Sequence, residues 1–305
     1  MAASIFPDVQ QAAREFQTLR DILRWAVSLF NEHDISFGQG TDNPWDEAVY
    51  LSLSALKLPI DLLEPFMDAR LTLSERTHLC ASIDKRVTTR LPAAYLTGEA
   101  WLQGFKFHIS QDCIIPRSPV AELIVQQLEP WIDDPAAPLN ILDMCTGSGC
   151  LAILAALHFP QAKVDAVDIS AQALEIAKKN VQAYGLQDRM QLFESDLFAQ
   201  LPAKTYDLIL CNPPYVNSHS MENLPAEFRH EPELALAGGT DGMDAVRNIL
   251  HDAPRFLNTE GILILEIGHE YEHFVRAFPQ LEPMWLSTAQ ADQQILLLYK
   301  EQLEP

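Results

Sequence analysis

Apolar runs typical of buried strands alternate with helical segments from about residue 139 to the end of the chain. The predicted strands span 139–143, 164–168, 190–194, 206–211, 261–267 and 295–299, and the predicted helices span 151–159, 171–184 and 245–256. Strands joined through helices lie parallel in one sheet, because each helix carries the chain back to the edge where the previous strand began. The sequence therefore predicts an α/β fold with a mostly parallel sheet that helices cover on both faces.

The first part of the chain has a different pattern and predicts a separate unit. Apolar residues recur at helical spacing in 9–30, 45–56 and 73–88, whereas 95–109 has the pattern of a short hairpin before an extended connector. We expect a small all-helical domain at 1–90 that recognises the substrate, and a hairpin and linker at 91–118. A larger domain at 119–305 is then expected to carry the chemistry.

The net charge restricts the partners that we expect. The chain has 21 Lys and Arg against 42 Asp and Glu, which gives a formal charge of −21 at pH 7. A surface this acidic repels phosphate backbones and attracts basic proteins. We therefore expect a basic protein partner and no direct readout of nucleic acid, although solubility alone is an alternative explanation for most of the charge.

The sequence carries no pattern of export or membrane insertion. No apolar run approaches the length of a membrane span, and residues 1–7 lack the basic end and apolar core of a signal peptide. The cysteines form no CxxC pair, and their odd number fits reduced thiols; they are Cys80, Cys113, Cys145, Cys150 and Cys211. We therefore expect a cytoplasmic protein without a membrane partner.

A stiff corner follows the predicted strand 206–211. The strand must end at Asn212, because Pro213 and Pro214 have no N–H group for the sheet. An amide or amino nitrogen with two N–H donors needs two acceptors, and the Asn212 side-chain oxygen and the Pro213 carbonyl can supply them. Taken alone, the motif is an ordinary turn as readily as a binding site.

Further polar residues follow the neighbouring strands. Asp143 opens a glycine-rich turn that leads into a helix, Asp168 ends the next strand 25 positions later, and Asp196 follows the third. This spacing is typical of an acid that binds a ribose, and Asp196 is placed to accept a hydrogen bond from an adenine amino group. Ligands of α/β sheets bind at these strand ends. The turn lacks a full GxGxxG, which argues against NAD, and the acids favour a cationic cofactor.

These motifs resemble those of the class I S-adenosylmethionine-dependent methyltransferases, and more narrowly the HemK-type protein N5-glutamine methyltransferases. The resemblance covers nearly the whole chain and rests on segments 143–149 and 212–215 with Asp168 and Asp196. Segments 115–119, with Glu122, and 230–237, leading to Asp241 and Gly242, extend it. It implies a Rossmann-like seven-stranded sheet, a helical amino-terminal domain and S-adenosyl-L-methionine as cofactor. Only 289–294 departs from the family pattern.

Within this family the segments are most similar to the branch that methylates a glutamine of the large-subunit ribosomal protein L-three, with release factors as the alternative substrate. The implied catalytic residues are Asn212, Pro213 and Tyr215, the implied cofactor-binding residues are Asp143, Cys145, Thr146, Gly147, Ser148, Gly149, Asp168, Asp196 and Asn212, and the implied substrate-binding residues are Asn212, Pro213, Pro214, Tyr215 and Arg117. Arg117 either contacts the substrate backbone or pairs with an acid. No general base is required, because the proton can leave after methyl transfer.

Three other functions deserve comparison with this one. Methylation of an amino-adenine uses the same Asn-Pro-Pro-Tyr corner, but the charge of −21 argues against a nucleic acid substrate. His269 to His273 match the zinc pattern HExxH, but Gly268 before them places the pattern at the entrance of a helix, so we expect no metal. A binding module without activity is disfavoured because Gly147, Gly149 and Asn212 are all present.

Overall fold

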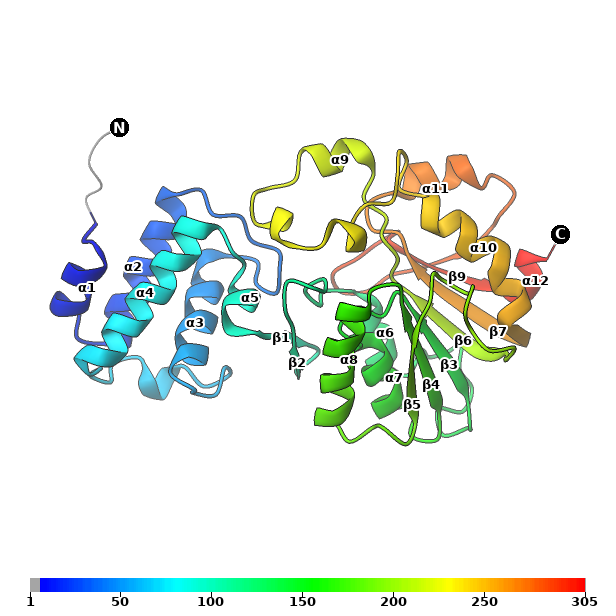
Figure 1. Cartoon of the computed structure of the whole chain (residues 1–305), viewed down its shortest axis with the longest axis horizontal. Coiled ribbons are helices and arrows are strands. Elements are labelled where there is room, and N and C mark those ends of the chain that lie inside the picture. Colours follow the sequence, from blue (N-terminus) through cyan, green and yellow to red (C-terminus); the bar gives the residue numbers. More distant parts are fainter. Residues whose placement is uncertain (1–5, 305) are drawn as a thin grey trace. The chain divides into compact units, whose positions relative to one another are not determined.

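The computed structural model describes residues 6–304. It divides into two compact units, of which one comprises the chain up to Glu99 together with Pro225–His230. The other comprises Ala100–Leu224 and the chain from Glu231 onward (Figure 1). Within the described range, no helix has both the length and the apolar character that crossing a membrane requires. The expectation about a signal peptide concerns residues 1–7, of which 1–5 lie outside the described residues.

The first unit is helical. Its helices are α1 (Val9–Glu15), α2 (Leu19–Glu32), α3 (Pro44–Ala55), α4 (Leu73–Thr89) and α5 (Ala93–Thr97), with a 3₁₀ turn at Glu64–Phe66. The single helix predicted over 9–30 is wrong, because Thr18 and Asp21 form a capping box that starts a new helix at Leu19. Trp25, Phe30 and Leu79 are fully buried in the core of this unit.

The hairpin that follows the helices is shorter than the predicted range 95–109. The hairpin consists of β1 (Glu99–Leu102) and β2 (Phe105–His108), whereas residues before Gly98 belong to α5. Helix α6 (Val120–Val125) ends at Val125, and Gln127 and Leu128 after it both adopt left-handed backbone conformations.

A seven-stranded sheet forms the second unit, as predicted. In spatial order it contains β5 (Met190–Glu194), β4 (Lys163–Asp168), β3 (Asn140–Met144), β6 (Tyr206–Cys211), β7 (Leu257–Glu266), β9 (Ile295–Tyr299) and β8 (Met284–Leu286). Strands β3 to β7 pair in parallel, and β9 pairs antiparallel with both of its neighbours. Strand β8 was not predicted, because three residues are too few for a periodic pattern.

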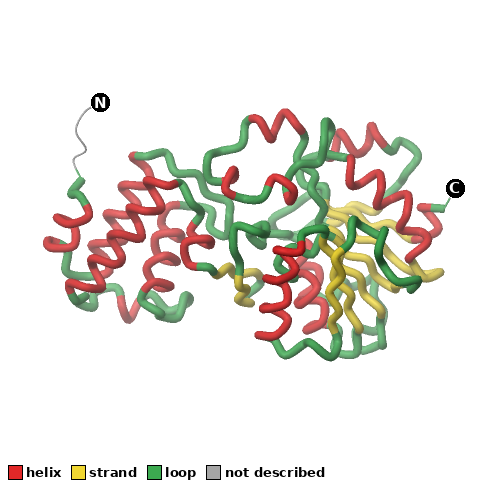
Figure 2. The backbone as a smooth tube through the Cα atoms, viewed as in Figure 1, coloured by secondary structure: helices red, strands yellow, loops and turns green. Residues whose placement is uncertain are grey.

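Helices cover both faces of this sheet (Figures 1 and 2). Ile141 and Leu208 pack into one core with α6, α7 (Cys150–His158) and α8 (Ala171–Ala183). Leu142 and Ile209, their chain neighbours, pack into the other core with α10 (Asp244–Phe256), α11 (Tyr271–Ala277) and α12 (Lys300–Leu303). The alternation follows from the period of two in a strand.

The strand order reverses at β3, and this reversal positions the site. The chain continues from β3 to β4 on one side, whereas β6 pairs with the other side of β3. The connections therefore diverge above the carboxyl ends of β3 and β6, and a crevice opens where α/β folds bind ligands.

Candidate active site

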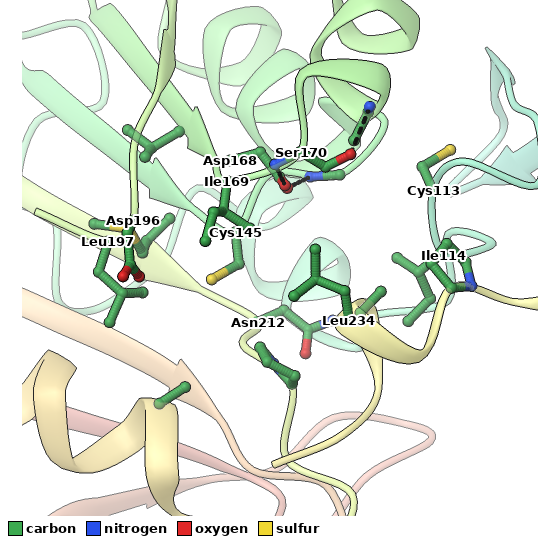
Figure 3. A pocket seen from close by; sticks show the side chains of 18 of the residues that line it. Cys113, Ile114, Cys145, Asp168, Ile169, Ser170, Asp196, Leu197, Asn212 and Leu234 are labelled. Carbon is green, nitrogen blue, oxygen red and sulfur yellow. Dashed lines mark hydrogen bonds between the residues drawn. The ribbon is translucent and has the colours of Figure 1, made fainter. Parts of the chain in front are cut away.

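A cavity of about 310 Å³ lies at the carboxyl ends of β3, β4, β5 and β6 (Figure 3). It brings together predicted site residues from four separate strand ends, namely Cys145, Gly147, Asp168, Asp196, Asn212 and Pro214. It also has a wall from the segment after the proline corner, which contributes Pro232, Leu234, Ala235 and Ala237. The remaining predicted residues lie around the cavity without lining it.

The turn after β3 depends on left-handed backbone conformations. Cys145, Gly147 and Gly149 all have positive φ angles, at 60°, 55° and 80°. A side chain at Gly149 would come within 3.1 Å of the Ala177 Cβ on α8, so only glycine lets the turn approach that helix this closely. Cys145 and Gly147 face the cavity, whereas Thr146 and Ser148 are buried behind them.

Asp143 supports this turn from behind and does not line the cavity. One of its carboxylate oxygens accepts hydrogen bonds from the Thr146 hydroxyl and, at 3.1 Å, from the Ala152 amide. Its other oxygen, Oδ1, is buried and has no hydrogen-bond partner within residues 6–304. Burial raises the pKa of this carboxyl to about 7. The contacts of Asp143 therefore hold the turn and the start of α7 in place.

Asp168 connects the turn to the second strand. Its two carboxylate oxygens accept hydrogen bonds from the amides of Gly147, at 2.8 Å, and Ser170, at 2.9 Å (Figure 3). Burial raises the pKa of Asp168. The Ile169 amide also donates to this carboxylate, which has about four acceptor positions in all, so Asp168 keeps acceptor capacity beyond these bonds. The geometry fits an acid that accepts from a diol.

Asp196 lies at the rim of the cavity. Its side chain is exposed, while its backbone amide donates to the side chain of Gln200 at 3.0 Å. Apolar side chains from Ile169 and Leu197, the chain neighbours of the two acids, also line the cavity. A flat aromatic group with polar edges would find apolar contact and an acceptor here.

Asn212 directly follows β6 and borders the cavity with Pro214 (Figure 3). Within the described part of the chain, its carboxamide has no hydrogen-bond partner. The preceding Cys211 is fully buried in the sheet core, and Pro213 is buried beside it. The corner therefore presents the Asn212 carboxamide at the cavity wall on a rigid base.

Tyr215 faces away from the cavity and fixes the corner from below. Its hydroxyl donates to the Glu266 carboxylate at 2.9 Å, and Ser118 also donates to this buried carboxylate. A side chain at Gly268 would approach the Tyr215 ring to 2.3 Å, so the ring packs directly on the backbone after β7. Tyr215 therefore positions Asn212 through the backbone between them.

Arg117 pairs with an acid, one of the two alternatives for this residue. Its Nη1 lies 3.0 Å from both carboxylate oxygens of Glu231 and 3.1 Å from the carbonyl of Ile115. The sequence motif 230–237 contains Glu231 but does not indicate this ion pair. The side chains that line the cavity from this segment were missed, because they are apolar and lack the periodic pattern of a regular element.

The HExxH pattern is divided by the start of a helix. His269 and Glu270 precede α11, and only His273 lies within it. Glu270 accepts from the Asn217 side chain at 2.7 Å and contacts His273. Across residues 6–304, no three side chains of the metal-binding types are grouped closely enough to hold an ion.

Comparisons with known proteins agree on one family. The family model described as methyltransferase small domain matches residues 120–278. The ribosomal protein uL3 glutamine methyltransferase of Bordetella pertussis is 61% identical over 290 residues, which cover 95% of this chain and 97% of that protein. The proteins of the same name from Burkholderia pseudomallei and from Neisseria meningitidis serogroup B are each 51% identical. Their matches cover 94% and 96% of this chain, and 96% of each relative.

A solved structure supports the fold independently. The hMettl16 catalytic domain, solved in complex with MAT2A 3′UTR hairpin 6, is similar with a TM-score of 0.50 at 16% identity. The match covers 74% of this chain and 80% of that one. The sheet order and this likeness show the class I methyltransferase fold. Because the sequence identity extends over almost the full length of each relative, the chain belongs to the family of ribosomal protein uL3 glutamine methyltransferases.

Proposed function

We propose that this protein methylates the side-chain nitrogen of a glutamine in uL3, the large-subunit ribosomal protein L-three. The observation that carries the proposal is the Asn212 carboxamide, which borders the cavity and makes no hydrogen bond to residues 6–304. A polar side chain on a rigid corner without a partner in the protein is suited to a partner from the substrate.

The cavity fits S-adenosylmethionine. The remaining acceptor capacity of the Asp168 carboxylate suits the ribose hydroxyls. Ile169 and Leu197 offer apolar contact to an adenine ring, and Asp196 can accept a hydrogen bond from its amino group. The turn at Cys145 and Gly147 would hold the methionine part. When bound, this cofactor supplies an electrophilic methyl group on a positively charged sulfur.

Asn212 and Pro213 activate the side-chain nitrogen of the substrate glutamine. The nitrogen of a carboxamide is a poor nucleophile, because its lone pair is delocalised into the carbonyl. The two N–H groups can donate hydrogen bonds to the Asn212 side-chain oxygen and the Pro213 carbonyl. These bonds orient the lone pair and stabilise the positive charge that develops on nitrogen. Fixed orientation of reacting groups can contribute roughly 7–11 kcal/mol to lowering a barrier. The proton leaves after transfer, so no protein base takes part.

The charge of the chain favours a ribosomal protein. A formal charge of −21 attracts basic proteins and repels the nucleic acid that surrounds them in ribosomes. A substrate of this kind also favours a cytoplasmic location. We assign the recognition of the rest of the substrate to the helical domain, which carries no part of the cavity lining described above.

Mass spectrometry of cells that lack this protein tests the substrate. We expect the loss of one methyl group from a single glutamine of uL3, and its return when the wild-type gene is restored. Loss of methylation from a release factor with uL3 unchanged would identify the alternative substrate. Transfer of labelled methyl from the purified protein to nucleic acid, with none to ribosomal proteins, would refute protein methylation altogether.

Asn212→Ala tests the assigned chemistry. We expect the variant to keep cofactor affinity within about tenfold and to lose turnover, because removal of one oriented acceptor leaves the substrate nitrogen misaligned. Calorimetry gives the affinity, and labelled methyl transfer to uL3 gives the rate. Asn223→Ala, an exposed asparagine at the end of α9 (Ser218–Glu222), is the matched control and should remain active.

A further inference from the structure

Two loops at the cavity are joined by one buried carboxylate. Glu231 accepts from the Arg117 guanidinium at 3.0 Å and from the Ile115 backbone amide at 3.2 Å. Its side chain is fully buried, so separation of the two loops would leave a charge without its partners inside the protein. The segment around Ile114 is therefore fixed to the segment that begins at Glu231.

The second of these loops is held on both sides of Leu234. The Val216 amide donates to the Leu236 carbonyl at 2.8 Å, and the Gly238 amide donates to the Val216 carbonyl at the same distance. Ala235 and Ala237 also bond back to Pro232 and Glu233, which closes a tight turn around Leu234. The backbone of Leu234 has little freedom, yet its side chain is 57% exposed.

Leu234 and Ile114 both line the cavity. In the view of Figure 3, Leu234 is drawn between Asn212 and Ile114, whereas Asp196 and Leu197 lie at the opposite side. Leu234 and Ile114 thus lie on the side of the cavity where Asn212 is proposed to bind the glutamine nitrogen of the substrate. An apolar side chain on a rigid loop binds a partner well, since little conformational entropy remains to be lost on association.

We propose that Leu234 and Ile114 form an apolar lip that packs against the residues next to the methylated glutamine. The inference rests on the proposed function and defines its substrate more closely. The lip has no charged group, so it selects a polypeptide segment in which small or apolar residues flank the glutamine. Free glutamine has no such neighbours and would gain nothing from this contact.

Steady-state kinetics of lip variants test this inference with uL3 as the protein substrate. Leu234→Ala should raise the KM for uL3 about tenfold, which corresponds to loss of most of the burial of one leucine side chain. Leu234→Asp should raise it further, because the new charge is desolvated against an apolar segment. For both variants, measured at saturating S-adenosylmethionine, we expect kcat within about twofold of wild type.

Val275→Ala on α11 is the matched control, because Val275 is an apolar side chain of similar exposure, 45%, and does not line this cavity. It should leave the KM for uL3 unchanged. Circular dichroism and melting temperature check that each variant folds. If the wild type methylates uL3 and both Leu234 variants keep its KM, the lip is refuted while the function stands. If the wild type does not methylate uL3 at all, both proposals fall.

Discussion

Asp168 illustrates how one side chain can serve the fold and the ligand together. It joins the turn after β3 to the start of α8 through the amides of Gly147 and Ser170, and its carboxylate still has acceptor capacity for a ligand. Loss of this carboxylate removes hydrogen bonds to a charged group, each worth about 1.5–3 kcal/mol.

We therefore expect Asp168→Ala to weaken the binding of S-adenosylmethionine by roughly ten- to a hundredfold. Calorimetric titration of the purified variant measures this change. Asp188→Ala removes an exposed acid of the same second unit and should bind the cofactor as the wild type does. Equal affinity of the two variants would show that Asp168 serves the fold alone.

The buried carboxyl of Asp143 predicts a pH dependence of stability. Its pKa rises from 3.8 in the unfolded chain to about 7 in the folded protein, because of burial. Between these values the folded protein binds more protons than the unfolded chain, so this residue lowers stability as pH increases. Below pH 4 and above pH 7 its contribution is constant, and the total change is on the order of 4 kcal/mol.

Asp143→Asn should remove this dependence, since the amide oxygen can still accept from Thr146 and Ala152 but no longer ionises. Unfolding in urea, measured at several pH values, gives the free energy for both proteins. We expect the stability of the variant relative to wild type to increase between pH 4 and pH 7. A difference that stays constant across this range would contradict the assignment.

The sequence allowed prediction of the residues whose chemistry is recognisable at the end of a strand. Asn212, Asp168 and Asp196 all border the cavity as the strand pattern implies. Asp143 and Tyr215 share the same motifs but point elsewhere, and nothing in the spacing of residues tells which side of a turn a side chain occupies. Leu234 was missed for a different reason, because its position depends on contacts made by Glu231 and Val216.

Prediction was most reliable for elements with a strong period. Strands β3, β4 and β6 are runs buried on both faces, and β5 is a less buried strand at the edge of the sheet, so the existence of the central strands was the easier to predict. The break between α1 and α2 was missed, because hydrophobic spacing continues across it while the Thr18 cap interrupts the backbone. Short elements such as β8 and α12, of three and four residues, are too short to show a periodic pattern.

Gly268, in the turn after β7, packs against the ring of Tyr215 in the proline corner. Gly268 has a φ angle of 55°, and an added Cβ would meet the Tyr215 ring at 2.3 Å. Gly185 has a similar φ of 66°, but nothing lies within 4 Å of its added Cβ. An alanine at either position has the same conformational cost of about 1–2 kcal/mol, because both backbones are left-handed. Comparison of the two substitutions therefore isolates the effect of the steric clash with Tyr215.

We expect Gly185→Ala to lose only that energy and to keep full turnover. Gly268→Ala should lose more stability and also lower kcat, because the displaced ring moves the backbone that carries Asn212. Denaturant unfolding and methyl transfer to uL3 provide the two measurements. If Gly268→Ala matched Gly185→Ala in both, the corner would not depend on the packing of Tyr215.

At the scale of the whole molecule, the path of the chain between Asn212 and α10 was the least predictable feature. Residues 225–230 belong to the helical unit, although more than a hundred residues separate them from its other members. The expected boundary near residue 90 reflected only the change of pattern along the sequence. A return of this kind depends on long-range ion pairs, which have no local signature.

Glu227 is at the centre of these ion pairs. Glu227 is fully buried in the helical unit, with Arg90 at 2.8 Å, Arg86 at 3.6 Å and the Ser36 amide at 3.1 Å. Glu47 also binds Arg86 there, at 2.6 Å, so two acids and two arginines balance each other, with Arg90 partly exposed and the other three buried. Removal of one partner from a buried pair leaves a charge without compensation and costs about 3–5 kcal/mol.

Glu227→Ala should therefore destabilise the helical unit by about this amount, and hydrogen exchange of the α4 amides reports that unit directly. Asp68→Ala is the control, because Asp68 forms an ion pair with Arg20 at 2.7 Å but is 74% exposed. Exposed pairs contribute about 1 kcal/mol or less, so α4 should exchange almost as in wild type. Equal protection of the α4 amides from exchange in the two variants would mean that apolar packing, and not the buried charge of Glu227, holds residues 225–230 in the helical unit.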